Sequence, residues 1–295
     1  MWLKRYPGNP ILKPVPYHDW ESLTLFNAAV VHSNGVFHML YRAQGSDRIS
    51  RLGYAVSRDG FKWMRLDEPV FEPQADYEAW GVEDPRITQI GDTFYMLYTG
   101  YSEKGTRVCM AATKNFITWE RYGIILPGYD DKDAALFPEK IRGRYCLFHR
   151  IPDDIWIAFS EDLRTWTDHR VIMEPRVGLW DSVRIGIAAP PIKTEAGWLI
   201  LYHGYNEARH YALGVALLAL DDPAHVLSRP QVPVLTPLTP WEKRGDVPNV
   251  VFSDAAVVVD DQLYVYYGAG DHVLAVAMCS MQELMNYLQR HMERE

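Results

Sequence analysis

The sequence predicts an all-β protein, a five-bladed β-propeller with a short C-terminal helix. A motif of two apolar residues, a variable residue and a proline occurs five times, with its prolines 59, 54, 48 and 62 residues apart. An aromatic-rich apolar run follows each copy, and helical periodicity is confined to the C-terminal end. Since no linker rich in proline, glycine or serine interrupts the pattern, we expect one domain over residues 1–295. The five prolines are Pro14, Pro73, Pro127, Pro175 and Pro237.

Each repeat is predicted to contain at least three strands. The aromatic-rich runs at 37–43, 94–100, 145–151, 198–204 and 263–269 have strand composition. Another apolar segment and a tight turn precede each run, and a third strand-like segment such as "RLGYAVS" or "YALGVALL" follows it. Strand–turn–strand–strand units of about fifty residues are typical of propeller blades. A tryptophan closely follows four of the five prolines, at Trp20, Trp80, Trp180 and Trp241.

A polar turn ending in tryptophan closes the first three repeats, as "SRDGFKW", "TKNFITW" and "SEDLRTW". The pattern resembles the Asp-box of sialidases. Because it recurs, whereas a catalytic group is needed once, we interpret it as a turn that pins adjacent strands.

The one predicted helix covers residues 281–294. Ser280 and Glu283 have the spacing of a capping box. Leu284, Leu288 and Met292 recur at helical spacing, so one face of this helix is expected to pack on the ring.

Composition narrows the function classes. The formal net charge of −8 disfavours a nucleic-acid partner. The sequence contains neither a long apolar run typical of a membrane span nor a secretory h-region, and its three cysteines have no metal or disulfide spacing. We therefore expect a cytoplasmic protein without a metal or cofactor. Whether it forms a homo-oligomer stays open.

Aligning the repeats places polar residues in two rings around the predicted axis. The second strands contribute a ring of Arg42, Thr99, Arg150, His203 and Gly268. The first strands contribute a ring of Asn27, Asp84, Ala135, Ala189 and Asp254. Since threonine, glycine or alanine occupies the same position in other repeats, the charged members are not required by the repeat itself.

The segment "GVEDPRI" at 81–87 places charges at the start of a predicted buried strand. Pro85 can occupy the first residue of a strand and keeps Asp84 extended. Two interpretations remain open here: Asp84 is a site residue at the axis, or Glu83 and Arg86 form a structural salt bridge.

Basic residues are predicted to meet at one mouth of the ring. Arg150, Arg184 and His203 are expected to converge there, together with Lys132. Any one of them alone would be explained by a salt bridge. Several in register favour an anion site, because the guanidinium group matches phosphate oxygens.

The motifs "GVEDPRI", "KDAALFPEKIRGRYCLFHRI", "WDSVRIG", "APPIKTEAGWLILYHGY" and "VYYGAGD" resemble glycoside hydrolase family 130. The resemblance runs from Asn9 to about Val276. It implies a five-bladed propeller and an inverting phosphorylase that cleaves β-1,2- or β-1,4-linked mannosides with inorganic phosphate to give α-mannose 1-phosphate. Manno-oligosaccharide and phosphate are therefore the expected partners.

The resemblance also implies roles for individual residues. Asp84 matches the sole catalytic acid, which in this family is thought to act through a sugar hydroxyl. The implied phosphate-binding residues are Arg150, Arg184, His203, Tyr211 and Lys132. The implied sugar-binding residues are Asn27, Arg42 and Asp271, with Tyr205 as a further aromatic candidate and Trp80 favoured as a packing residue.

Two alternatives remain. An inverting hydrolase on the same fold needs a second carboxylate to activate water, for which Asp181 and Asp254 are available. A non-catalytic carbohydrate-binding propeller would need no acid at position 84. Neither the linkage nor the acceptor sugar follows from the sequence.

Overall fold

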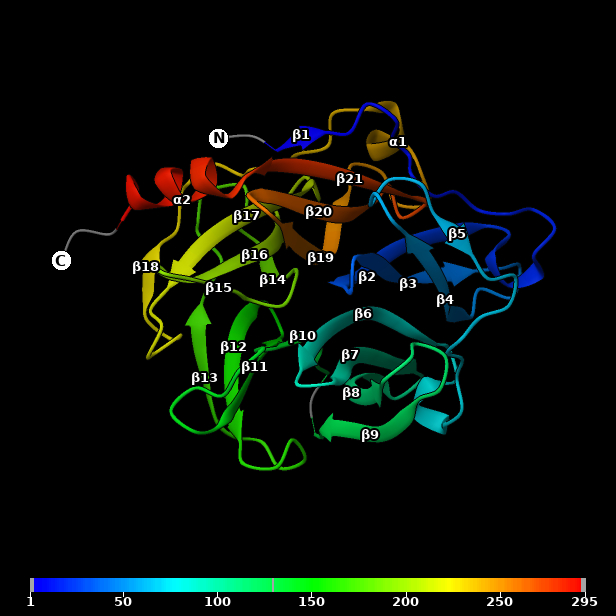
Figure 1. The fold of residues 1–295 in the computed structure, drawn as a ribbon, viewed down its shortest axis with the longest axis horizontal. Coiled ribbons are helices and arrows are strands. Elements are labelled where there is room, and N and C mark those ends of the chain that lie inside the picture. Colours follow the sequence, from blue (N-terminus) through cyan, green and yellow to red (C-terminus); the bar gives the residue numbers. More distant parts are fainter. Residues whose placement is uncertain (1–2, 129, 293–295) are drawn as a thin grey trace.

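The structure, a computed structural model, describes residues 3–128 and 130–292. As predicted, the described chain is built from β-strands with only short helices. Its strands form four hydrogen-bonded sheets. Figure 1 shows these sheets arranged around the middle of the molecule.

The largest sheet contains two antiparallel meanders, which we call unit 1 and unit 2. Unit 1 comprises β2 (Thr24–Ser33), β3 (Val36–Gln44), β4 (Ser50–Ser57) and β5 (Met64–Arg65). Unit 2 comprises β6 (Gly81–Ile90), β7 (Thr93–Ser102), β8 (Gly105–Thr113) and β9 (Glu120–Leu126). A single parallel residue pair, Ser50 with Gly81, joins the two units.

The other three sheets are one meander each. Unit 3 comprises β10 (Lys132–Leu136), β11 (Tyr145–Ile151), β12 (Asp154–Ser160) and β13 (Thr167–Met173). Unit 4 comprises β14 (Arg184–Ile187), β15 (Ile192–Thr194), β16 (Gly197–Tyr205), β17 (Tyr211–Leu218) and β18 (Val226–Ser228). Unit 5 comprises β19 (Val251–Val259), β20 (Gln262–Ala269), β21 (Val273–Ser280) and the N-terminal strand β1 (Lys4–Arg5).

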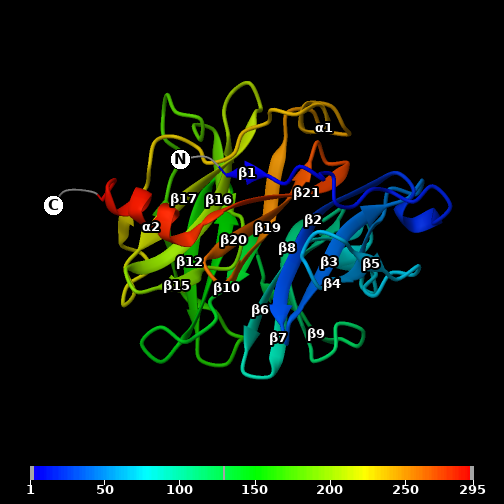
Figure 2. The ribbon, with the colours of Figure 1, turned by 45° about the horizontal axis from the view of Figure 1, so that its top comes forward.

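The two ends of the described chain meet in unit 5. Strand β1 pairs with β21, so that Lys4 lies opposite Met278, and Figure 2 shows the two strands side by side. The first strand of each unit lies toward the middle in Figure 1, and β2 packs against both β6 and β19. Residues far apart in the sequence can therefore meet at the centre.

Five apolar clusters hold the units together. Each cluster spans two neighbouring units, and unit 1 also packs on unit 5 through residues such as Leu25, Met39 and Tyr266. The sheets are thus covered on both faces, which explains why their middle strands are nearly continuous apolar runs.

The polar turns that close the first three units are each held by a side chain of the turn itself. Asp59 accepts hydrogen bonds from the backbone N–H groups of Phe61 and Lys62, both at 2.8 Å. Asn115 and Asp162 make the same pair of bonds in units 2 and 3.

The C-terminal helix α2 spans Met281–Gln289 and is shorter than predicted. Ser280 caps it by accepting the N–H of Glu283. Leu284 and Leu288 are buried, whereas Met292 is 42% exposed and lies beyond the helix, and Tyr287 is buried instead. Residues 293 and 294 of the predicted helix lie outside the described residues. No helix in the described ranges is long and apolar enough to span a lipid bilayer.

Units 1, 2, 4 and 5 share a buried cluster that we call the triad: an acidic residue, a tyrosine and an arginine. In unit 2 the acid is Glu78, which accepts from the hydroxyl of Tyr98 at 2.7 Å and from Arg121 at 3.0 Å. The arginine comes from the unit's outer strand, and the tyrosine from its second strand. The other triads are Glu21–Tyr41–Arg65, Asp181–Tyr202–Arg229 and Glu242–Tyr267–Arg5.

The triads connect the chain before each unit to that unit's middle and outer strands. Three of the acids lie in short helices: η1 (Asp19–Glu21), η2 (Asp76–Glu78) and α1 (Pro240–Lys243). All four acids are fully buried. A buried carboxylate is tolerated only when it is paired and hydrogen-bonded, so each triad fixes how its unit begins.

The triads also correct one part of the predicted repeat. Trp20, Trp180 and Trp241 each directly precede a triad acid, but in unit 2 that position is Tyr77. Trp80 is therefore outside the repeat. It is 48% exposed and meets Tyr101 edge-on, so the prediction that it is a packing residue is wrong.

We predict that Glu78→Gln lowers the free energy of unfolding by about 3 kcal/mol or more, because Arg121 loses its carboxylate partner in a buried site. Urea denaturation followed by tryptophan fluorescence measures the change. Glu103→Gln, at an exposed position, is the matched control and should stay within about 0.5 kcal/mol of the parent. Equal stability of the two variants would contradict the structural role of the triad.

Candidate functional site

Bulges in the first strands turn polar side chains toward the middle of the molecule. Strands β2, β6, β10 and β19 each shift register where Asn27, Asp84, Asp133 and Asp254 lie. Asn27, Asp84 and Asp133 have φ of 46°, 49° and 52°. The prediction that Pro85 begins the strand and keeps Asp84 extended is therefore wrong, because β6 begins at Gly81 and Asp84 lies in its bulge. Asparagine and aspartate tolerate this left-handed conformation better than other residues with a side chain.

The positions of the bulges show that the predicted ring of first strands is wrong in unit 3. In unit 3 the bulge residue is Asp133, not Ala135, because the hairpin that follows is longer: β10 ends where Leu136 pairs with Leu147, whereas the hairpins of units 1 and 2 close tightly at Ser33–Val36 and Ile90–Thr93. Ala135 and Ala189 are both buried apolar residues. The sequence contains a signal that finds Asp133: asparagine or aspartate followed by two alanines occurs at 27–29, 133–135 and 254–256.

Asp84 lies at the centre of a buried polar cluster. One carboxylate oxygen accepts from Asn27 Nδ2 at 2.9 Å and from Arg42 Nη1 at 2.8 Å. The other lies 3.6 Å from Lys132 Nζ. The Lys132 side chain is 27% exposed, whereas the Asp84 side chain is 3% exposed.

The two residues that flank Asp84 and Pro85 have different partners. Glu83 binds Arg42 Nη2 at 2.5 Å and the hydroxyl of Ser50 at 3.2 Å. Arg86 instead pairs with Asp254 at 2.7 Å. The alternative that "EDPR" is a structural Glu83–Arg86 salt bridge is therefore wrong.

Arg86 is a buried guanidinium group that joins several units. It is 1% exposed and donates to the backbone carbonyls of Asp84, Ile187 and Ala188. It also lies 3.5 Å from Asp133. Arg86 thus holds strand β6 against β10, β19 and the segment that begins with β14.

Arg150 and His203 meet at Asp133. Arg150 Nε donates to Asp133 at 2.7 Å, and His203 Nε2 lies 3.2 Å from the same oxygen. Burial raises the pKa of Asp133, but Arg150 and His203 outweigh it and hold that pKa well below its usual range. Burial lowers the pKa of His203 more than Asp133 raises it, so this ring is neutral near pH 7.

Glycines make room for these contacts. A Cβ at Gly186 would lie 2.6 Å from both Asp133 and His203. A Cβ at Gly268 would lie 2.6 Å from Asn27. Gly268, the fifth member of the predicted ring of second strands, is therefore a glycine because a side chain there would collide with Asn27.

Arg184, Tyr205 and Tyr211 form a wall beside this cluster. Arg184 pairs with Asp153 at 2.6 Å and lies over the Tyr205 ring at 5.9 Å. The Tyr205 and Tyr211 rings are 4.6 Å apart. Burial raises the pKa of Tyr211 to about 12, and its hydroxyl interacts electrostatically with Asp133 and Arg150. This wall therefore adjoins the Asp133 pair.

Two further carboxyl groups resist ionisation. Burial raises the pKa of Asp271 to about 7, although Arg42 opposes this effect. Burial also raises the pKa of Asp254 far above its usual range, although Arg86 lies 2.7 Å away. At neutral pH Asp271 is close to half ionised.

Asp84 behaves in the opposite way. Burial raises its pKa, but Arg42 and Lys132 outweigh burial and lower it to about 2. The carboxylate of the ligand-free protein is therefore ionised at neutral pH, and a bound anion that competes for Lys132 would raise its pKa.

Several buried polar atoms at the centre have no hydrogen-bond partner among the described residues. They are Asn27 Oδ1, His203 Nδ1 and Asp254 Oδ2, whereas Asp254 Oδ1 lies 2.7 Å from Arg86. Buried polar atoms are normally satisfied, so the first two are suited to a ligand or water. The described ranges contain no group of three or more histidine, cysteine or acidic residues arranged to hold a metal ion.

We predict that Asp271→Asn stabilises the ligand-free protein at pH 8 by up to about 4 kcal/mol. Because the folded-state pKa is about 7 against an ordinary value of 3.8, this carboxyl contributes its full stability below pH 4. That contribution is lost as the pH rises through 7, and an uncharged amide avoids the loss.

Thermal melts at pH 4 and pH 8 measure this difference. Asp221→Asn, at an exposed carboxylate paired with Arg142, is the control and should show no gain that depends on pH. A melting temperature of Asp271→Asn that tracks the parent at both pH values would contradict the assignment.

Known proteins share the sequence and the fold of this chain. The family model of glycoside hydrolase family 130, described as beta-1,4-mannooligosaccharide phosphorylase, matches residues 3–290. The 1,2-beta-oligomannan phosphorylase of Thermoanaerobacter sp. (strain X514) is 47% identical over 292 residues, which cover 96% of this chain and 98% of that protein. The beta-1,4-mannooligosaccharide phosphorylase of Ruminococcus albus is 32% identical, over 97% of this chain and 91% of that protein.

A solved structure agrees with these relatives. The structure of the beta-1,2-mannobiose phosphorylase from Listeria innocua in complex with beta-1,2-mannobiose superposes with a TM-score of 0.92 at 33% identity. The superposition covers 99% of this chain and all of that one. This protein therefore belongs to glycoside hydrolase family 130.

Proposed function

We propose that this protein is an inverting β-mannoside phosphorylase that uses inorganic phosphate as co-substrate and releases α-mannose 1-phosphate. One observation carries the proposal: the carboxyl group of Asp84 lies next to Lys132, and Arg150 and His203 meet at Asp133 beside it. The family membership supports the same reaction.

A β-1,2-linked manno-oligosaccharide is the proposed substrate. The 1,2-beta-oligomannan phosphorylase is 47% identical to this chain, against 32% for the enzyme named for β-1,4 linkages. The beta-1,2-mannobiose complex also shares the fold over nearly the whole chain.

The proposed roles follow the geometry. Asp84 is the proton donor. The sugar in the cleaved subsite is held by Asn27, Arg42, Asp271 and Tyr205. Phosphate is bound by Lys132, Arg150, Arg184, His203 and Tyr211. Trp80, exposed at the start of β6, is a candidate platform for the acceptor sugar.

The reaction needs one acid and no base. A phosphate oxygen attacks the anomeric carbon from the face opposite the leaving group, the bond from that carbon to the glycosidic oxygen breaks, and this oxygen takes the proton of Asp84. Phosphate is already an anion, so no residue has to deprotonate it. The bound charge also weakens the hold of Lys132 on Asp84, which favours protonation of the acid.

The hydrolase alternative is less well supported. A hydrolase needs an ionised carboxylate to activate water. Asp181 is engaged by Arg176, Arg229 and Tyr202 in its triad. Asp254 is fully buried and paired with Arg86 at 2.7 Å, so it is not free to activate water.

We also propose that the five units are the five blades of one propeller domain spanning residues 1–295. The five apolar clusters that join neighbouring units, and the pairing of β1 with β21, support this architecture. The three cysteines are buried and free, which is consistent with a reducing cytoplasm.

The central prediction is that turnover depends on phosphate. With β-1,2-mannobiose, the protein should form α-mannose 1-phosphate and mannose in phosphate buffer and be inactive without phosphate. ³¹P NMR detects the product and its anomeric configuration. Release of mannose at the same rate in phosphate-free buffer would instead establish a hydrolase.

Variants should separate the acid from the phosphate site. Asp84→Asn is expected to abolish turnover, whereas a non-catalytic sugar-binding protein would be unaffected by the change. Arg150→Ala should weaken phosphate binding by about 2–5 kcal/mol and change the KM for the mannoside much less. Equal effects on both substrates would contradict the assignment of Arg150.

A further inference from the structure

Unit 3 departs from the triad of the other four units. Its acid is Asp131, which is 1% exposed and directly precedes β10. The tyrosine of the second strand is replaced by His149, and the arginine of the outer strand is replaced by His169. A permanently charged arginine is thus exchanged for a side chain that titrates near neutral pH.

The two histidines and the acid form one hydrogen-bonded chain. His149 Nδ1 lies 2.7 Å from Asp131 Oδ2, and His169 Nδ1 lies 3.0 Å from His149 Nε2. His149 is fully buried. The two rings meet edge to face, with their centroids 5.0 Å apart, across strand β12.

The chain ends at the residues proposed to bind phosphate. The second oxygen of Asp131 accepts the backbone N–H of Arg150 at 3.2 Å. This bond lies beside the bulge of β10, which places Lys132 next to Asp84 and directs Asp133 to Arg150. Asp131 therefore fixes the backbone from which both cations extend.

A proton count shows that the chain is incomplete in its neutral form. The Nδ1–H group of His149 donates a hydrogen bond to the carboxylate of Asp131. His149 Nε2 therefore carries no proton and must accept a hydrogen bond from His169 Nδ1. A neutral His169 then has a bare Nε2, which faces the carbonyl oxygen of Trp166 at 3.3 Å. One added proton at this nitrogen supplies the missing donor.

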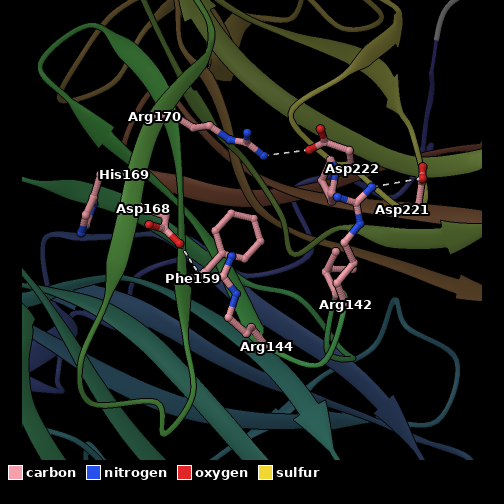
Figure 3. Close-up of a pocket in the computed structure, with 10 residues that line it drawn as sticks. Arg142, Arg144, Phe159, Asp168, His169, Arg170, Asp221 and Asp222 are labelled. Atoms are coloured by element: carbon pink, nitrogen blue, oxygen red, sulfur yellow. Dashed lines mark hydrogen bonds and ion pairs between the residues drawn. The ribbon is translucent and has the colours of Figure 1, made fainter.

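His169 reaches the protein surface at a cavity of about 450 Å³ between units 3 and 4. Figure 3 shows three arginine–aspartate pairs around this cavity, none of which includes His169. The charged and titratable groups that face His169 or share its cavity are Asp131, His149, Arg142, Arg144, Asp168, Arg170, Asp221 and Asp222. Burial and then His149 lower the pKa of His169, and Asp131 and Asp168 only partly oppose them.

We propose that Asp131, His149 and His169 form a proton-linked positioning chain that orients Arg150 and Lys132 and so sets the affinity of the phosphate site. This proposal rests on the proposed function, because the three residues are assigned the role of supporting the proposed phosphate site. Protonation of His169 completes the chain, so the contribution of the chain to phosphate affinity is largest at acidic pH.

The test measures the KM for phosphate of wild type and His169→Phe at pH 5.5 and pH 8. Taking the ratio of variant to wild type at each pH cancels the ionisation of phosphate itself. We expect the ratio to be about ten at pH 5.5, the scale on which indirect hydrogen-bond partners act in metal sites, and below three at pH 8. The KM for the mannoside should change less than twofold.

A double variant and a matched control sharpen the test. His149→Tyr combined with His169→Arg restores the triad of the other units, so its phosphate KM should stay within threefold of wild type and its advantage over His169→Phe should no longer depend on pH. Arg5→Gln breaks the triad of unit 5 and should lower the melting temperature while leaving the phosphate KM within twofold.

Two results would separate the failure of this proposal from that of the proposed function. If wild-type turnover needs phosphate but His169→Phe matches wild type at both pH values, the positioning chain is refuted and the phosphorylase remains. If wild-type turnover does not need phosphate, the proposed function fails. Calorimetric titration of inorganic phosphate into the same proteins gives the affinity ratios without turnover, and equal affinities would again refute the chain.

Discussion

The centre of this protein depends on the burial of one guanidinium group, that of Arg86. A charge that is 1% exposed is stable only with close partners. Arg86 is paired with Asp254 of unit 5 and Asp133 of unit 3. It also donates to three backbone carbonyls, one in unit 2 and two in unit 4. This one side chain therefore fixes the position of the bulge that presents Asp84.

Around Arg86, cations and carboxylates are matched in pairs. Arg42 and Lys132 hold Asp84, and Arg150 holds Asp133. An arriving phosphate must compete with these carboxylates, and by doing so it frees Asp84 from part of the positive charge that keeps it ionised. The same electrostatics can thus bind the anion and prepare the acid.

The strand pattern and the ring of second strands could be predicted from the sequence. Aromatic-rich runs repeat at nearly constant spacing, so aligning them placed Arg42, Arg150 and His203 correctly around one centre. The ring of first strands failed at Ala135, because the alignment was made on the turns and the hairpin between β10 and β11 is longer than those of units 1 and 2. The partners of Arg86 could not be predicted either, because Asp133 and Asp254 lie far away in the sequence.

The triads were present in the sequence but were not recognised. The residue before each member of the second-strand ring is a tyrosine in four repeats and His149 in the other. An aromatic residue directly precedes each of the four acids, but nothing in the sequence pairs an acid with its arginine, so only the fold brings each set together. The histidine in unit 3 can be recognised as a replacement of the triad tyrosine only after the other four triads have been seen in the structure.

The most direct test is a crystal structure with bound phosphate and a mannoside. The account predicts that phosphate lies within hydrogen-bonding distance of Lys132, Arg150 and His203, with Asp84 on the opposite side of the anomeric carbon. A phosphate bound away from these residues, or one on the same side of the sugar as Asp84, would contradict it.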